Sequence, residues 1–130
     1  MTNMTKTVGG ALASSVFAIA LSTTGSIDAA RLTIFHALEQ AMAAAERNEQ
    51  TSHDLRLRNR LAQAFSVRLS IQAVDALFLA SGGQSIFTGK PIQRAWRDAH
   101  AGGVHVSMNW DAVSTMYGQH ALGLEPKGQY

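Results

Sequence analysis

The sequence contains no cysteine and only two prolines among its 130 residues. Without thiols the chain can form neither disulfides nor zinc–thiolate sites, and thiol-based catalysis is excluded. This composition is typical of a reducing compartment, so we expect a cytoplasmic protein.

Charge is scarce as well. Charged residues make up 15% of the chain, and the formal net charge is only +2. The densest basic run places Arg56, Arg58 and Arg60 at alternate positions, which on a helix spread over a wide arc and do not form one stripe. We therefore expect no nucleic-acid partner.

The chain lacks an apolar run of the roughly 20 residues that a membrane-crossing helix needs. Residues 8–21 are small and apolar, and with Lys6 before them they weakly resemble a secretory signal. A single positive charge, a run interrupted by Ser14 and Ser15, and no clear cleavage site argue against export. We expect neither insertion into a membrane nor secretion.

The main pattern in the sequence is the recurrence of apolar residues at helical spacing. Hydrophobic residues make up 46% of the chain, enough for the core of one domain. Helical spacing recurs over residues 8–47, as one helix with a weak joint at Gly25 or as two, then over about 52–80, from Pro91 onward, and over about 109–122. No strand-length alternation competes, so we predict an all-α fold, an up-and-down bundle of four or five helices.

The domain organisation that follows is simple. We expect residues 1–10 to be disordered, residues 11–123 to form the bundle, and residues 124–130 to be an extended tail. The helix over 52–80 has an apolar stripe wider than one partner would cover, which predicts a central position. Its inward charged residues, Arg68 and Asp75, each need a partner if they are buried.

The most informative stretch is residues 81–111. Gly82 and Gly83 follow a long helix, where glycine commonly ends helices, and His105 is expected in a turn before a helix capped by Asn109. The segment GGQSIFTGK has neither the spacing nor the preceding strand of a phosphate loop. Taken alone, His105 fits a loop histidine bonded to backbone better than it fits a reactive group.

The five histidines do not predict a metal site. His100 and His105 are five residues apart, whereas pairs of histidine ligands on a helix stand three or four apart, and no carboxylate completes a ligand set beside them. We expect His36 and His53 on helix surfaces or a turn. We expect His120 to interact with the carbonyls that end its own helix.

The combined pattern LASGGQSIFTGKPIQRAWRDAHAGGVHVSMNWD, followed by LGLEP, resembles the C-terminal helical domain of the acyl-CoA dehydrogenase superfamily over residues 27–123. It is most similar to the two-component flavin-dependent monooxygenases, such as the oxygenase components of p-hydroxyphenylacetate and hydroxylated-steroid hydroxylases and dibenzothiophene monooxygenase. Dehydrogenases of the superfamily carry a glutamine where this chain has Leu79. They commonly carry a glutamate base in the turn where it has His105.

The resemblance implies a site and its partners. His105 would lie beside a reduced flavin, FMN or FAD, and assist formation of the C4a-(hydro)peroxyflavin or deprotonation of a small aromatic substrate. Gly82, Gly83 and Gln84 would lie along the cofactor. A separate flavin reductase would deliver the reduced flavin. A homo-oligomer or a companion subunit would supply the N-terminal and middle domains that the family's enzymes also contain.

The resemblance therefore predicts the C-terminal bundle, as a fragment or a subunit, of a flavin-dependent monooxygenase that hydroxylates an aromatic or heteroaromatic substrate. Two other functions stay open. One is an acyl-CoA dehydrogenase-like flavoprotein, for which the missing glutamate is the main objection. The other is a non-catalytic helical module that only oligomerises.

Overall fold

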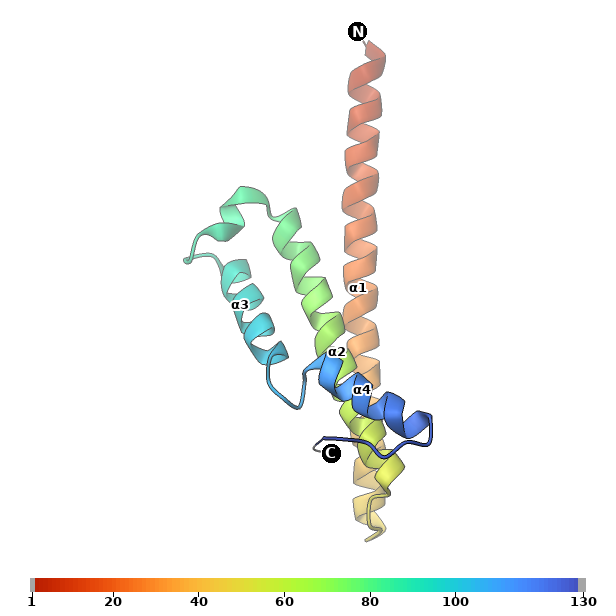
Figure 1. Ribbon diagram of the computed structural model, residues 1–130. Helices are drawn as coiled ribbons and strands as arrows, with labels where there is room; N and C mark the ends of the chain where they lie inside the picture. The colour runs from red at the N-terminus through yellow and green to blue at the C-terminus, as the bar shows by residue number, and fades with distance from the viewer. Residues whose placement is uncertain (1, 129–130) are drawn as a thin grey trace.

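The chain is all-α in the computed structural model, which describes residues 2–128 and their side chains from residue 14 onward. Its helices are α1 (Thr2–Glu46), α2 (His53–Ala80), α3 (Pro91–Gly103) and α4 (Trp110–Ala121) (Figure 1). A short 3₁₀ helix, η1 (Gly82–Ile86), lies between α2 and α3. No strand occurs over residues 2–128, and the all-α prediction is confirmed.

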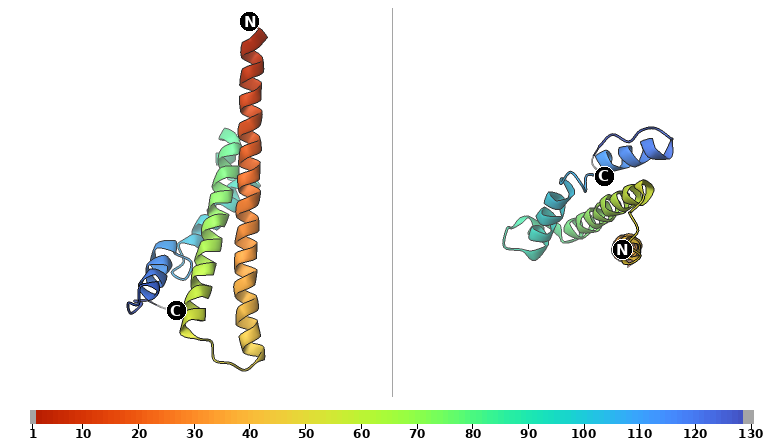
Figure 2. Two further views of the ribbon diagram at one scale, coloured as in Figure 1. Left: turned by 90° about the vertical axis from the view of Figure 1, so that its right-hand side faces the viewer. Right: turned by 90° about the horizontal axis from the view of Figure 1, so that it is seen from below.

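Helix α2 is the centre of the molecule. It contacts α1, η1, α3 and α4. Figure 2 shows α1 on one side of α2, with α3 and α4 together on the other side. The first three α-helices run up and down in turn, whereas α4 crosses α2 obliquely (Figure 1). The predicted central position of this helix is therefore confirmed.

Small residues form the contact of α1 with α2. The buried positions of α1 recur every seven residues, at Thr23, Ala30, Ala37 and Ala44. Because these side chains are short, the two helix backbones can approach closely along this line. The buried hydroxyl of Ser66 on α2 donates to the Ala30 carbonyl at 3.0 Å, which joins the two helices across it.

The main hydrophobic core lies between α2 and α4. Its buried members are Leu57, Ala64, Val113 and Met116, and two aromatic side chains, Trp110 and Tyr117, pack against it. This core holds α4 across α2, and it thereby holds the turn that joins α3 to α4.

The N-terminal part of α1 differs from the sequence prediction. Residues 2–10 continue the helix, although residues 1–10 were expected to be disordered; residue 1 lies outside the described residues. Each residue added to an existing helix gains a backbone bond without a new nucleation step, so a polar segment can extend it. The helix also runs through Gly25, because a glycine there costs only about 1 kcal/mol.

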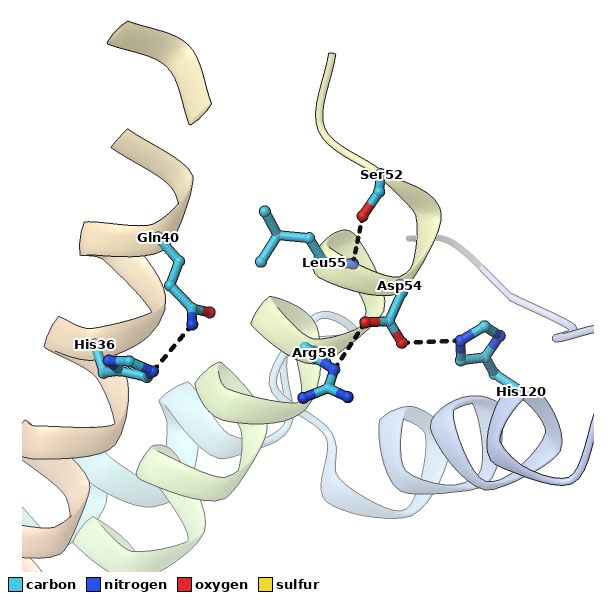
Figure 3. Close-up of polar contacts among 7 residues, drawn as sticks. All are labelled: His36, Gln40, Ser52, Asp54, Leu55, Arg58 and His120. Atoms are coloured by element: carbon cyan, nitrogen blue, oxygen red, sulfur yellow. Dashed lines mark hydrogen bonds and ion pairs between the residues drawn. The ribbon is translucent and has the colours of Figure 1, made fainter. Parts of the chain in front are cut away.

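A polar contact joins the first turn of α2 to the last turn of α4 (Figure 3). Asp54 pairs with Arg58 one turn later, with 2.8 Å between its Oδ2 and the Arg58 Nε. Its Oδ1 lies 3.2 Å from His120 Nε2. The prediction that His120 serves its own helix end was therefore wrong, because the crossing of α4 over α2 brings a carboxylate within reach.

This contact predicts an acid-dependent loss of stability. The hydrogen bond from His120, followed by the nearby charge of Arg58, lowers the pKa of the Asp54 carboxyl. A carboxyl with a lowered pKa stabilises the fold above its unfolded pKa of about 3.9, and this contribution is lost as the pH falls through the folded pKa. The difference in melting temperature between wild type and Asp54→Asn should therefore be present at neutral pH and vanish in acid. Circular dichroism melts at a series of pH values measure it.

The control for this prediction is Asp28→Asn, which changes an exposed carboxyl in the middle of α1. Its melting temperature should differ from wild type by the same small amount at every pH. A difference for Asp54→Asn that stays constant from neutral pH into strong acid would contradict the assignment.

The C-terminal tail folds back along α4. The Leu124 amide donates to the Gln119 carbonyl at 2.8 Å, and the Lys127 amide donates to Gln119 Oε1 at 2.9 Å. Gly128 packs so closely on Met116 that a Cβ there would lie 3.2 Å from the sulfur. This part of the tail therefore forms a strap beside the α3–α4 turn; residues 129–130 lie outside the described part.

The face of α1 turned away from α2 is apolar and exposed. Its large hydrophobic side chains are Phe17, Leu21, Leu32, Phe35, Leu38 and Met42. Within the described part of the chain, no helix combines the length and hydrophobicity needed to span a membrane. An exposed apolar row of this kind is typical of a protein–protein contact.

Candidate functional site

His105 lies in the turn between α3 and α4, where the sequence predicted it. Its amide donates to the Gly102 carbonyl at 3.2 Å, at the end of α3. Its own carbonyl accepts from the amides of Met108 and Asn109 at 2.8 and 2.9 Å. Asn109 then caps α4 by accepting from the Ala112 amide at 3.1 Å. Backbone bonds therefore hold the histidine on both sides of the turn.

The His105 ring is held by Ser107. The Ser107 hydroxyl lies 2.7 Å from the ring Nδ1, and the Ser107 amide donates to the same nitrogen at 3.3 Å. Because an amide can only donate, Nδ1 is the acceptor, and the neutral ring carries its proton on Nε2. The sequence analysis missed Ser107. The signal that could have found it is a serine two residues after a turn histidine, a spacing at which side chains bond locally.

The neighbours of His105 are apolar and strongly exposed. Val104 is 76% exposed and Val106 is 65% exposed. Large aliphatic side chains on both sides of an exposed imidazole form a surface that a flat apolar group can cover. The turn therefore exposes apolar surface on both sides of the imidazole.

The glycine segment lies at the other end of α3. Gly82 adopts a φ of +67°, which lets the chain leave α2, and Ser85 closes the turn by donating to the Gly82 carbonyl at 2.6 Å. No atom lies within 4 Å of a Cβ built at Gly82 or Gly83, and Gln84 is exposed. The backbone here is open to close approach by another molecule.

The two predicted parts of the site are not adjacent in one chain. The glycine segment and the His105 turn stand at opposite ends of α3 (Figure 1). That helix has 13 residues, so at about 1.5 Å per residue its ends are roughly 20 Å apart. The chain therefore brings His105 and Gly82–Gln84 to two separate places. A single bound molecule can contact both places only if it is elongated.

A polar junction on α2 positions α3. Both the indole Nε1 of Trp96 and the Nε2 of His100 lie within hydrogen-bond distance of Asp75 Oδ1, at 2.7 and 2.9 Å. The two rings also pack on each other with centroids 4.3 Å apart. Asp75, which was expected to need a partner if buried, thus has two, Trp96 and His100. His100 serves the packing of α3 on α2.

Removing this junction should destabilise the fold measurably. Asp75→Leu leaves the Trp96 and His100 donors without their acceptor, and because the site is only half-buried we expect a loss of about 1 kcal/mol of unfolding free energy. Urea unfolding followed by tryptophan fluorescence measures it. Asp75→Asn keeps a carbonyl acceptor at the same place and should cost less. Equal losses for the two variants would contradict the role of the acceptor.

The other charged residue expected to face inward, Arg68, is exposed and lies over Trp110 at the start of α4. Its guanidinium carbon is 4.8 Å from the centroid of that ring, a cation–π distance. Trp110 also packs against Phe65, with ring centroids 5.7 Å apart. These contacts fix the first residue of α4 and therefore one side of the His105 turn.

The remaining histidines form no metal centre in the part of the chain described here. His36 forms a hydrogen bond with Gln40 on the exposed side of α1, with 3.0 Å between the two Nε2 atoms (Figure 3). His53 stacks on His120, with centroids 5.5 Å apart. Across residues 14–128, no group of three histidine or carboxylate side chains is close enough to hold a metal ion.

Comparison with known proteins relates this geometry to a family. Residues 11–110 match the family model described as acyl-CoA dehydrogenase, C-terminal domain. The chain is 50% identical over 109 residues to the oxygenase component of an FADH2-dependent resorcinol hydroxylase from a Rhizobium species. That match covers 81% of this chain and 27% of the relative.

Solved structures have the same fold. The 3-HSA hydroxylase from Rhodococcus sp. RHA1 superposes with a TM-score of 0.79 and 32% identity, over 85% of this chain and 29% of that one. XiaF from a Streptomyces species, solved with FADH2 and glycerol, superposes with a TM-score of 0.79 and 30% identity, over 86% of this chain and 29% of that one. The chain thus spans between a quarter and a third of the length of these proteins.

Proposed function

Because the chain belongs to the acyl-CoA dehydrogenase C-terminal domain family, we propose that it forms the C-terminal bundle of the oxygenase component of a flavin-dependent monooxygenase. The substrate class that we propose is a small aromatic compound. The observation that carries the proposal is the His105 ring, which Ser107 holds in an exposed, apolar turn.

The tautomer of His105 decides what this residue does. With Nδ1 accepting from Ser107, the neutral ring carries its proton on Nε2 and can donate a hydrogen bond from this atom to an oxygen of a bound reactant. The role that this geometry supports is stabilisation of negative charge that develops on that oxygen. Because neither ring nitrogen is then a free acceptor, hydrogen-bond donation fits the geometry better than deprotonation of the substrate.

The cofactor that we propose is a reduced flavin, delivered by a separate flavin reductase. When bound, it would supply the activated oxygen that is transferred to the aromatic ring. Val104 and Val106 would cover an apolar ring system, and the open backbone of Gly82 and Gly83 would allow close approach of its elongated part. Since roughly 20 Å separates these places, other polypeptide must complete the binding site.

We propose that this other polypeptide comes from copies of the chain together with the domains that the longer relatives contain. The exposed apolar row of α1, from Phe17 to Met42, provides the contact surface. Light scattering on the purified chain, alone and with separately produced N-terminal and middle domains, measures whether such assemblies form.

The test of the function is reconstitution. The chain is combined with the N-terminal and middle domains of a longer relative, reduced flavin, a flavin reductase and either resorcinol or p-hydroxyphenylacetate as substrate, and both flavin retention and hydroxylated product are measured. The proposal requires product only when all the domains are present. Failure to retain flavin in any assembly would support a non-catalytic oligomerisation module. Turnover of an acyl-CoA with an electron-accepting dye would support a dehydrogenase.

A further inference from the structure

A cavity of about 310 Å³ lies beside the His105 turn, between α2, α4 and the C-terminal strap. Its wall is mostly apolar and comes from Val106, Ala112, Val113 and Met116. Ser107 and Gly128 complete the wall, and two basic residues, Arg60 and Lys127, line it from opposite elements. A concave apolar wall with few polar groups is the usual form of a small-molecule site.

The two basic side chains have no acidic partner within the described residues. Arg47, Arg58 and Arg94 each form an ion pair with a neighbouring carboxylate, whereas Arg60 and Lys127 form none among residues 14–128. No residue that lines the cavity is acidic. Two cations on a cavity lined by no acidic side chain attract an anion.

The strap holds the backbone of Lys127 in place. The Lys127 amide donates to Gln119 Oε1 at 2.9 Å, and Gly128 packs on Met116. Arg60 is half-buried on α2, on the other side of the cavity. Arg60 and Lys127 therefore lie on different elements, α2 and the strap. Only the fold brings them to the same cavity.

The cavity is also connected to His105. Ser107 lines it and binds the Nδ1 of the His105 ring at 2.7 Å. Val106, the next residue after the histidine, lines it as well. A ligand in this cavity would therefore lie against the turn whose imidazole is the proposed hydrogen-bond donor.

We propose that this cavity binds a single aromatic ring that carries a carboxylate. The ring would pack on Val106 and Ala112, which are exposed, and the carboxylate would lie between Arg60 and Lys127. Its volume is at the lower end of the range for ligand pockets, about 300–1,000 Å³, which suits a molecule with one ring. The inference that such an acid is the substrate rests on the proposed function. The inference that it binds in this cavity does not depend on that function.

Binding is tested on the full 130-residue chain without flavin. The ¹⁵N-labelled chain is titrated with p-hydroxyphenylacetate, with its neutral amide p-hydroxyphenylacetamide, and with inorganic phosphate. We expect p-hydroxyphenylacetate to shift the amide signals of Val106, Ser107 and Val113, and to bind about tenfold more tightly than the amide, since one charge-assisted bond is worth about that factor. Equal affinities for acid and amide would overturn the proposal, and so would an equal response to phosphate.

Two variants locate the carboxylate. Arg60→Gln and Lys127→Gln should each weaken binding of p-hydroxyphenylacetate about tenfold and leave binding of the neutral amide unchanged. Arg56→Gln, an exposed arginine one turn earlier on α2 that does not line the cavity, is the matched control and should bind as wild type does. Unchanged affinity in both test variants, or an equal loss in the control, would overturn the assignment.

These measurements are independent of hydroxylation. If the acid binds as expected but the reconstituted assembly forms no product, the cavity assignment stands and the proposed function fails. If product forms while the acid and the amide bind equally well, the function stands and the cavity assignment fails.

Discussion

Replacing His105 by alanine should lower hydroxylation by the reconstituted oxygenase about a hundredfold, while the consumption of reduced flavin continues. The variant loses the Nε2 proton that Ser107 presents by holding Nδ1 as an acceptor. A preorganised hydrogen-bond donor at a developing negative charge commonly contributes about 10²–10³ in rate, and we expect the lower end because the turn is exposed. The measurement is the ratio of hydroxylated product to hydrogen peroxide formed for each reduced flavin oxidised.

His36→Ala is the matched control for this experiment. His36 is also an exposed histidine, but its ring bonds to Gln40 on α1, away from the α3–α4 turn (Figure 3). Its product ratio should equal that of wild type. An unchanged product ratio in His105→Ala would reject the role of His105, whatever the overall rate.

The largest effect on stability is expected from Leu57→Ala. Leu57 is 0% exposed and is the largest side chain that the described core buries completely. Truncating a buried leucine to alanine removes its transfer free energy and leaves a cavity, which together cost about 2–5 kcal/mol. We expect a loss of about 3 kcal/mol, and a melting temperature lower by about 10 °C, in urea and thermal unfolding experiments.

Leu79→Ala is the control, because Leu79 lies on the same helix and is 78% exposed. It should change the unfolding free energy by less than about 0.5 kcal/mol. Similar losses for the two variants would show that the core between α2 and α4 does not carry the stability of the fold. The position of the His105 turn would then have to depend on contacts other than this core.

Much of the local structure was predictable because it depends on residues within a few positions of each other. Apolar periodicity placed the long central helix over about 52–80, and the structure has α2 at His53–Ala80. Pro91 begins α3, since proline tolerates the first helical position. Gly82 adopts the positive φ that ends α2. The turn that contains His105 follows from the helices on either side of it.

Local sequence patterns failed to predict contacts between residues that are far apart in the chain. His120 sits in the last turn of α4, which suggested contact with helix carbonyls, yet it binds Asp54 on α2. Arg60 looked like one of several solvated arginines, yet the fold places it on a cavity that Lys127 also lines. No spacing in the sequence encodes either pairing, since both depend on the angle at which α4 crosses α2.

The sequence by itself determined the all-α class, the extents of α2 and α4, the start of α3 and the presence of a histidine in an interhelical turn, because side-chain periodicity and backbone preference act over one or two helical turns. Only the tertiary structure decided that the glycine segment and His105 stand at opposite ends of α3. It alone also decided that a cavity lined by Arg60 and Lys127 lies beside the histidine. Those relations arise from how α3, α4 and the strap pack around α2, and packing depends on the shapes of surfaces distant in the chain.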